Sequence, residues 1–235
     1  MADESEFSEF VIGKIDPSPG NIRTFRLFPK GGGAPPERKP GQYVSLKIGG
    51  LERAYSLSGP IDAEYLEVTV RLLGEFTTKL FSMGEGETIL ASKPIGRFVL
   101  SGEKLSSGKG IVFLAGGVGI TPFLSMLDYL SKAKESPEVT LIYGSRRPSE
   151  IIMKERIEEL LRNIPKCKII HTVDSGEPGW DGKIGFIGKE LIAESVKNPK
   201  ESLFFICGPP PMVKSLVSAL KELGVPVQSI TLEGW

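Results

Sequence analysis

The chain has 235 residues, of which 40% are hydrophobic and 25% charged, a composition typical of globular proteins. Its 29 basic and 29 acidic side chains cancel, so the charge balance does not indicate a nucleic-acid partner. The longest apolar runs are too short to span a bilayer, and the acidic residues 1–6 lack the apolar stretch of a secretory signal. The sequence therefore predicts no membrane span and a cytoplasmic location.

The chain has two cysteines, Cys167 and Cys207, which stand far apart and form no C-x-x-C pair. This spacing argues against a disulfide framework or a zinc site. Iron–sulfur clusters usually need four thiolates, so we expect no metal in this chain. An electron-transfer partner that carries such a cluster is expected to be a separate chain.

The first hundred residues read as short strands separated by turn residues. Apolar and β-branched segments with alternating pattern cover residues 10–15, 22–28, 42–48, 54–57, 65–72 and 87–92. Short strands at this spacing predict a small antiparallel β-barrel of about six strands. The Gly- and Pro-rich residues 31–36 are predicted to form a mobile loop.

After the Gly- and Ser-rich residues 102–108 the pattern changes to strands that alternate with helices. The strand segments are 110–115, 140–143, 168–172 and 203–206, and the helical segments are 122–133, 150–163, 189–196 and 211–223. This alternation predicts a doubly wound parallel sheet with helices on both faces. We therefore expect two domains, 1–103 and 104–235.

The second domain opens with a strand that runs into Gly116-Gly117-Val118-Gly119-Ile120-Thr121-Pro122. Thr121 suits a helix N-cap and Pro122 the first helical position. Free amides at this helix start would suit a pyrophosphate, and the glycines would let a ligand approach the backbone. The spacing is not G-x-G-x-x-G, so an ordinary Gly-rich turn is an equal alternative for this motif alone.

Two motifs in the first domain carry polar groups that suit a phosphate-bearing ligand with an aromatic ring. In Arg53-Ala54-Tyr55-Ser56, Arg53 suits a diphosphate, Tyr55 can pack on a ring and Ser56 can donate a hydrogen bond. Gly74-Glu75-Phe76-Thr77-Thr78 starts a short helix with two hydroxyls at its N-terminus, a second candidate phosphate site. An exposed strand and an ordinary helix cap are the alternatives.

The last motif, Cys207-Gly208-Pro209-Pro210-Pro211-Met212, follows a predicted parallel strand. Ligands of open α/β sheets bind at the carboxyl ends of such strands. The chain then ends in Glu233-Gly234-Trp235, whose terminal ring could be a loose end or a plug packed on a ligand ring.

Taken in order, these motifs resemble the ferredoxin–NADP⁺ reductase family, and the resemblance covers nearly the whole chain. The family pattern is an R-x-Y-S strand, a glycine followed by Ser/Thr in a phosphate loop, a Gly-Gly-x-Gly-x-x-Pro turn and a Cys-Gly-Pro-x-x-Met segment. The resemblance implies an FAD-binding barrel, an NAD(P)-binding sheet, and an enzyme that passes electrons between a nicotinamide dinucleotide and a one-electron carrier such as ferredoxin or flavodoxin. FAD is preferred to FMN by the same analogy.

The resemblance also implies a role for individual residues. Ser56, Cys207, Glu233 and Trp235 would serve catalysis: Ser56 beside flavin N5, Cys207 beside the nicotinamide, Glu233 orienting Ser56 or relaying a proton, and Trp235 covering the flavin and moving aside. The expected cofactor-binding residues are Arg53, Ala54, Tyr55, Ser56, Val70, Leu72, Gly74, Phe76, Thr77, Thr78, Gly117, Gly119, Thr121, Pro122, Arg146, Arg147, Cys207, Gly208, Pro209, Met212 and Trp235. His171, the single histidine, lies in a predicted strand and is expected to be structural.

The preferred dinucleotide rests on Tyr143-Gly144-Ser145-Arg146-Arg147, which follows a predicted strand. By resemblance the adenosine ribose is read here, and Arg146 and Arg147 could hold a 2′-phosphate. The alternative is a solvated basic turn paired with glutamates of the next helix. No acidic residue ends this strand, so the sequence favours NADPH, with NADH as the second choice.

Four other functions stay open. The chain could be the reductase component of an oxygenase or an NAD(P)H:flavin reductase. It could also be an electron-transfer subunit docked to a larger dehydrogenase, although such relatives usually carry a cysteine-rich cluster segment. A binding module without catalysis is the least favoured, because each cofactor motif is complete.

Overall fold

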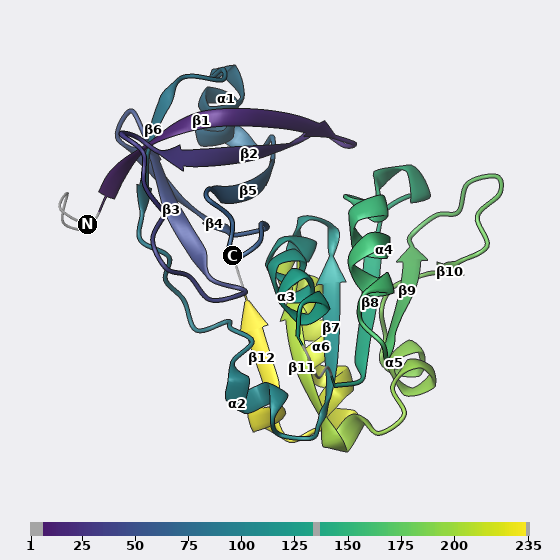
Figure 1. Ribbon diagram of the computed structural model, residues 1–235. Coiled ribbons are helices and arrows are strands. Elements are labelled where there is room, and N and C mark those ends of the chain that lie inside the picture. Colours follow the sequence, from purple (N-terminus) through teal and green to yellow (C-terminus); the bar gives the residue numbers. More distant parts are fainter. Residues whose placement is uncertain (1–6, 134–136, 234–235) are drawn as a thin grey trace.

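The computed structural model describes residues 7–133 and 137–233, which form two six-stranded sheets (Figure 1). The first sheet contains β1 (Phe7–Ser18), β2 (Ile22–Pro29), β3 (Tyr43–Ile48), β4 (Leu51–Ser56), β5 (Leu66–Arg71) and β6 (Thr88–Ser92). Every strand pair is antiparallel, in the order β4-β3-β6-β1-β2-β5. An isolated bridge between Leu57 and Val68 joins the two outer strands. The predicted six-stranded antiparallel barrel is confirmed.

Strand β5 shows why this part of the sequence folds as a barrel wall. Leu66, Val68 and Val70 are almost fully buried and belong to the barrel core. The residues between them are polar and point to the other side of the strand, because successive side chains of a strand alternate. This outer face is also buried, which becomes important for the contact between the domains.

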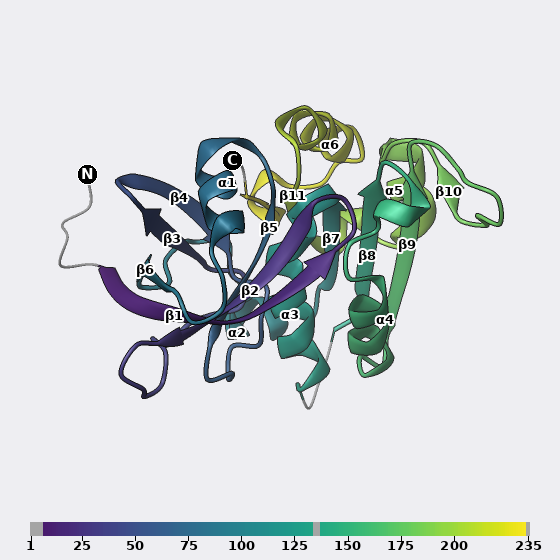
Figure 2. The same ribbon diagram turned by 90° about the horizontal axis from the view of Figure 1, so that it is seen from above.

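The second sheet is parallel, in the order β10-β9-β8-β7-β11-β12. Its strands are β7 (Gly110–Gly116), β8 (Val139–Ser145), β9 (Cys167–Val173), β10 (Lys183–Ile184), β11 (Ser202–Cys207) and β12 (Ile230–Glu233), and its main helices are α3 (Thr121–Ser131), α4 (Lys154–Arg162), α5 (Lys189–Ser195) and α6 (Pro210–Glu222). Figure 2 shows α3 and α4 on one side of the sheet and α5 and α6 on the other. The doubly wound parallel sheet is confirmed.

Successive side chains of the central strand β7 pack on opposite faces of this sheet. In β7, Ile111 and Phe113 pack in the cluster that contains the buried face of α3. Val112 and Leu114 pack in the cluster that contains α5 and α6. Because both faces are covered, the strand is apolar at nearly every position, as is typical of parallel sheets.

Three features differ from the sequence-based expectation. Helix α4 begins at Lys154 rather than at residue 150, because Ile151 and Ile152 are buried in the core and Met153 has a left-handed backbone (φ 52°). Helix α3 begins at Thr121 with Ile120 as its N-cap, so the prediction of Thr121 as the cap is wrong. Strands β10 and β12 and the short helix α2 (Gly102–Leu105) were not predicted.

The two sheets are joined through a chain segment that belongs to both. Phe98 follows the last barrel strand, yet its ring packs on Phe123 and Phe205 of the second domain, with centroid separations of 5.7 and 5.6 Å. The Gly41 amide donates to the Ser125 hydroxyl at 2.9 Å. Strand β12 ends beside the barrel (Figure 1). We propose the division into 1–103 and 104–235, which falls within α2.

Over the residues that the structure describes, no helix is long and apolar enough to cross a membrane. Within the same residues, no group of three or more His, Cys, Asp or Glu side chains could hold a metal ion.

Candidate active site

The candidate site lies where the strand order of the parallel sheet reverses. Strands β7 and β11 are direct neighbours, but the chain leaves β7 toward α3 on one face and β11 toward α6 on the other. The carboxyl ends of these strands, Gly116 and Cys207, therefore lie side by side at one edge of the sheet. Crevices at such switch points are where open α/β sheets bind their ligands.

The glycines at this point are required by the close approach of two backbones. A Cβ on Gly119 would meet the Cys207 carbonyl oxygen and come within 2.8 Å of the Gly208 nitrogen. A Cβ on Gly116 would meet the Met212 sulfur and lie 3.1 Å from Pro209 Cδ. The Gly-rich turn after β7 and the Cys207–Met212 segment after β11, both predicted to bind the dinucleotide, thus pack directly against each other.

Thr121 and Pro122 complete the turn that follows β7. The buried Thr121 hydroxyl donates to the Val118 carbonyl at 3.0 Å, so it supports the turn rather than capping the helix. Gly117 has φ of 53°, the left-handed region that favours glycine. The residues therefore hold a tight turn at the N-terminus of α3, where backbone amides favour an anion.

Cys207 and Glu233 are brought together by a strand that the sequence pattern did not predict. They are direct partners in the parallel pair β11–β12. Cys207 is fully buried, and burial raises the pKa of Glu233 to about 7. Glu233 can therefore hold and release a proton near neutral pH. Trp235 lies outside the described residues.

Strand β4 carries the Arg53–Ser56 motif along the barrel wall. Ser56 is buried, and its hydroxyl has no hydrogen-bond partner within the described residues. The Tyr55 ring packs on the Phe76 ring with centroids 5.7 Å apart, and burial raises the pKa of Tyr55 to about 12. Arg53 is exposed and donates to the Glu52 carbonyl at 2.7 Å. The unpaired hydroxyl is the kind of group a ligand would satisfy.

The loop and helix after β5 place the second predicted phosphate site. Gly74 begins α1 (Gly74–Ser82) with φ of 80°. The Thr77 hydroxyl accepts from the Leu73 amide at 2.6 Å and donates to the Gly74 carbonyl, to which Thr78 also donates. The Thr77 hydroxyl therefore bonds the backbone on both sides of the helix start, the Thr78 hydroxyl bonds only a carbonyl within the helix, and the first amides of the helix remain the donors for an anion.

Four other predicted residues lie in or near β4, β5 and α1. The side chains of Val70 and Phe76 belong to the barrel core, so only their backbone could reach a ligand. Leu72 is 38% exposed at the surface. Ala54 lies between Arg53 and Tyr55 and is half-buried.

Arg71 was not identified from the sequence, although it joins the two halves of the site. It ends the outer face of β5, and its terminal Nη2 is 3.7 Å from the position of a Cβ on Gly117. Its Nε is buried and has no partner among the described residues. A buried, unpaired guanidinium nitrogen beside a left-handed glycine turn fits a phosphate ligand. The available signal was the polar alternation of Glu67, Thr69 and Arg71.

Arg146 and Arg147 follow β8 and are exposed, and within the described part of the chain neither forms an ion pair with a carboxylate. The predicted alternative, a turn paired with the glutamates of the next helix, is not observed there. Both guanidinium groups are accessible to a ligand.

The structure adds two carboxylates to this turn that sequence reasoning missed. Asp174, which follows the neighbouring strand β9, donates its amide to the Ser145 carbonyl at 3.1 Å. Glu177 accepts from the Ser149 amide and hydroxyl at 3.2 and 2.8 Å. Two acidic residues that follow the next strand, β9, therefore contact the turn that carries the arginines.

His171 in β9 lies away from these motifs. It packs beside the Tyr143 ring with centroids 5.8 Å apart, and burial lowers its pKa.

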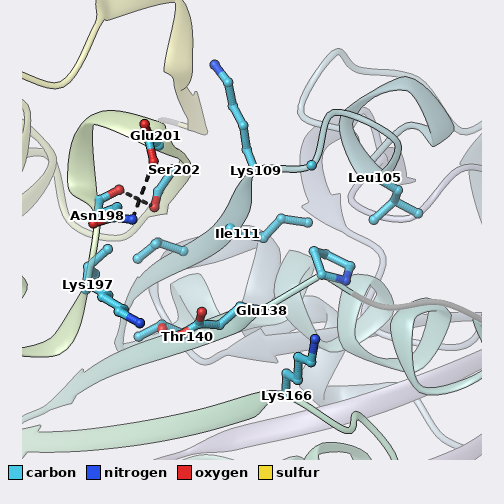
Figure 3. A pocket seen from close by; sticks show the side chains of 15 residues that line it. Leu105, Lys109, Ile111, Glu138, Thr140, Lys166, Lys197, Asn198, Glu201 and Ser202 are labelled. Atoms are coloured by element: carbon cyan, nitrogen blue, oxygen red, sulfur yellow. Dashed lines mark hydrogen bonds between the residues drawn. The ribbon is translucent and has the colours of Figure 1, made fainter.

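A hollow of about 460 Å³ lies at the amino ends of the strands of the parallel sheet (Figure 3). No predicted site residue lines it; its walls include Lys109, Glu138, Thr140, Lys166, Lys197 and Ser202.

An antiparallel barrel joined to a doubly wound sheet with a Gly-rich switch point is typical of the class of two-domain dinucleotide-binding oxidoreductases. Comparison with known proteins agrees with this class. Residues 113–218 match the family model described as "Oxidoreductase NAD-binding domain".

Relatives and solved structures extend the likeness to the whole chain. NADH-cytochrome b5 reductase 1 of Dictyostelium discoideum is 28% identical over 78% of this chain, and the flavohemoprotein of Halalkalibacterium halodurans is 30% identical over 97%. The chain spans 66% and 59% of the lengths of these two proteins. A ferredoxin NADP⁺ reductase from Neisseria gonorrhoeae, solved with bound FAD and NADP, is 26% identical with a TM-score of 0.82, covering 98% of this chain and 99% of that one.

The cytochrome b5 reductase domain of Ulva prolifera nitrate reductase has the same fold, with a TM-score of 0.86, 20% identity and 98% coverage of both chains. These likenesses support the FAD- and NAD-binding flavoprotein reductase family that the motifs predicted.

Proposed function

We propose that this chain is an FAD-dependent reductase that takes hydride from a nicotinamide dinucleotide and delivers electrons to a one-electron carrier protein. The observation that carries the proposal is Arg71: a barrel residue whose guanidinium lies against the Gly117 turn of the second domain, with a buried Nε that has no partner among the described residues. The unpaired Ser56 hydroxyl gives the barrel a second polar group suited to a ligand. When bound, FAD supplies the exchange between two-electron and one-electron chemistry.

The residues of the barrel are proposed to hold FAD. Arg53 and the first amides of α1, with Thr77 and Thr78, would bind its phosphates. The Tyr55 ring, already packed on Phe76, would support the isoalloxazine ring, and the Ser56 hydroxyl would donate to its N5. Ala54, Val70, Leu72, Gly74 and Phe76 would line the same site.

The residues of the switch point are proposed to hold the nicotinamide dinucleotide. Gly117, Gly119, Thr121 and Pro122 would approach its pyrophosphate together with Arg71. The nicotinamide ring would lie against Cys207, in a pocket shaped by Gly208, Pro209 and Met212. Glu233, with its pKa raised to about 7, would orient Ser56 or relay a proton to the flavin. Trp235 would cover the flavin until the dinucleotide enters.

The preferred dinucleotide is proposed to be NADH. An acidic residue after the strand that borders the ribose can accept hydrogen bonds from the 2′-hydroxyl, and it repels a 2′-phosphate. No acidic residue ends β8 itself, but Asp174 and Glu177 follow the neighbouring strand β9, and their contacts with Ser145 and Ser149 bring them to the same turn. NADPH is the second candidate, favoured by the unpaired guanidinium groups of Arg146 and Arg147.

The electron acceptor is proposed to be a ferredoxin or flavodoxin-like carrier, as the motifs suggest. A cytochrome b5-type haem protein is the second candidate, because two of the relatives are named NADH-cytochrome b5 reductases.

The test is anaerobic titration of the purified protein with NADH and NADPH while the flavin absorbance is followed. A yellow protein bleached at lower concentrations of NADH than of NADPH supports both parts of the proposal. A protein that binds FAD but resists both donors would instead be a subunit fed by another chain. A protein that binds no flavin contradicts the proposed function. Addition of oxidised ferredoxin, flavodoxin or cytochrome b5 to the bleached protein then identifies the class of acceptor.

The arginines and carboxylates are tested as matched variants. If NADH is preferred through the carboxylates, Asp174→Asn should lower the KM for NADPH, because a repulsive charge is removed, and raise that for NADH, because the charged acceptor of the 2′-hydroxyl is lost. If the arginines bind a 2′-phosphate, replacing Arg146 and Arg147 by Ala should raise the KM for NADPH selectively. Equal effects on both dinucleotides would assign these residues to structure.

A further inference from the structure

The outer face of β5 forms a polar seam between the two domains. Glu67 and Thr69 are only 2% and 3% exposed although they point away from the barrel core. The Glu67 carboxylate accepts from Arg156 Nη1 of α4 at 2.6 Å, from Arg26 Nε of β2 at 3.2 Å and from the Ser58 hydroxyl at 3.1 Å. Arg156 is the member of this cluster that comes from the other domain.

Arg156 also holds the backbone of the chain that leaves β4. Its Nη2 donates to the Ser58 carbonyl at 3.0 Å, while the Ser58 amide donates to the Glu67 carbonyl at 2.9 Å. Both main-chain polar groups of Ser58 are therefore fixed, one within the barrel and one by α4. Ser58 follows Ser56, the proposed flavin N5 ligand, by two residues.

We propose that Arg156 is a positioning residue that sets the placement of the Ser56 segment relative to the dinucleotide domain. The inference rests on the proposed function. A guanidinium has a rigid fork of donors, so it can bind a carboxylate and a carbonyl together and fix direction as well as distance. Reaction rates between bound groups depend steeply on such placement, and a misplacement of about 1 Å can cost about 100-fold.

The Arg156 contact differs from the other ion pair that joins the domains. Lys132 pairs with Asp62 at 2.8 Å, but the two side chains are 49% and 63% exposed. Exposed pairs contribute little, because solvent screens them and flexible side chains must be ordered. In the Arg156–Glu67 pair the carboxylate is 1% exposed. Lys132→Met is therefore a matched control that removes a link between the domains without disturbing the seam.

Loss of Arg156 should leave the barrel folded. Glu67 would keep its pairing with Arg26 and its hydrogen bond from Ser58. What the variant loses is the connection from these groups to α4. We therefore expect a change in placement rather than unfolding.

The experiment compares wild type, Arg156→Met, Arg156→Lys and Lys132→Met as FAD-loaded full-length protein. The first readout needs no turnover: the amplitude of the flavin absorbance change on titration with NAD⁺, together with the dissociation constant. The second is the limiting rate of flavin reduction at saturating NADH. For Arg156→Met we expect a smaller amplitude and a limiting rate reduced about tenfold. Its dissociation constant should stay within about twofold of wild type, because no ligand-binding group is removed.

The two other variants separate positioning from charge. Arg156→Lys keeps the positive charge but cannot bind both groups in the same geometry, so it should be slow like Arg156→Met. Lys132→Met should match wild type in both readouts. A wild-type amplitude and rate in either Arg156 variant would overturn the proposal. If Arg156→Met does not fold, Arg156→Lys decides the question alone. A wild-type flavin that neither NADH nor NADPH reduces would instead refute the proposed function, and the amplitude would still report on positioning.

Discussion

The close approach of two backbones at the switch point predicts that Gly119→Ala is strongly destabilising. Gly119 has an ordinary backbone conformation that alanine can adopt, so the cost comes from contact alone. The new Cβ would lie 2.5 Å from the Cys207 carbonyl carbon and 2.8 Å from the Gly208 nitrogen. These are backbone atoms of a central strand, which cannot rotate away as a side chain can.

The magnitude follows from the shift that would relieve this contact. Carbon contacts are normally about 3.5 Å or longer, so the turn after β7 that holds Gly119 and the end of β11 would have to separate by about 1 Å. Such a shift would weaken one or two ladder hydrogen bonds at about 1 kcal/mol each and add packing strain, for a total of about 3 kcal/mol. In a protein of this size that corresponds to a Tm lower by roughly 6 to 12 °C.

The assay is thermal unfolding followed by circular dichroism, in parallel with titration of the dinucleotide. Gly102→Ala is the control, because a Cβ at this helical position meets nothing within 4 Å, and it should be neutral or slightly stabilising. We expect Gly119→Ala to lose both stability and dinucleotide affinity. A variant with the Tm and affinity of wild type would refute the close contact between Gly119 and the backbone of Cys207 and Gly208.

Three further substitutions test single groups of the site. Ser56→Ala removes a buried hydroxyl without a partner, so the FAD-free variant should be as stable as wild type or more stable, while flavin reduction should slow. A Tm lowered by several degrees would show that the hydroxyl has a hydrogen-bond partner within the protein. Arg71→Met should weaken pyrophosphate ligands about 10- to 100-fold, which isothermal titration can measure, and unchanged affinity would remove Arg71 from the site. Glu233 should give the rate of flavin reduction a pH dependence with an apparent pKa of about 7 that is absent in Glu233→Gln. The pKa of this acid is raised by folding, so the protein should also lose stability as pH rises toward 7, and Glu233→Gln should lose less.

Much of the fold could be predicted because its signals are local. The barrel strands alternate in period two, and the strands of the second sheet are apolar on both faces, as Ile111 to Leu114 show. Strand β12 escaped prediction because it has four residues and is defined only by its pairing with β11. The start of α4 was placed too early because burial of Ile151 and Ile152 overrides the helical pattern.

The candidate site likewise contains some residues that a local motif predicts and others that only the folded structure brings together. Motifs such as Gly116–Pro122 can be predicted because consecutive residues act together. Asp174 and Arg71 act on turns that are distant in the sequence, and no short pattern reports such contacts. Arg156 is a further case: it lies 89 positions from its partner Glu67.

The contact between the domains combines two kinds of interaction with different consequences. Apolar packing around Phe98 is not directional, so it holds the domains together without setting their orientation closely. The hydrogen bonds of Glu67 and Arg156 are directional but contribute modestly to stability. Truncation of Phe98 should therefore lower stability more than the rate, whereas truncation of Arg156 should do the reverse. A polar face on a buried strand is unfavourable for folding alone, and its presence on β5 is explained if the reaction requires that the two domains meet in one register.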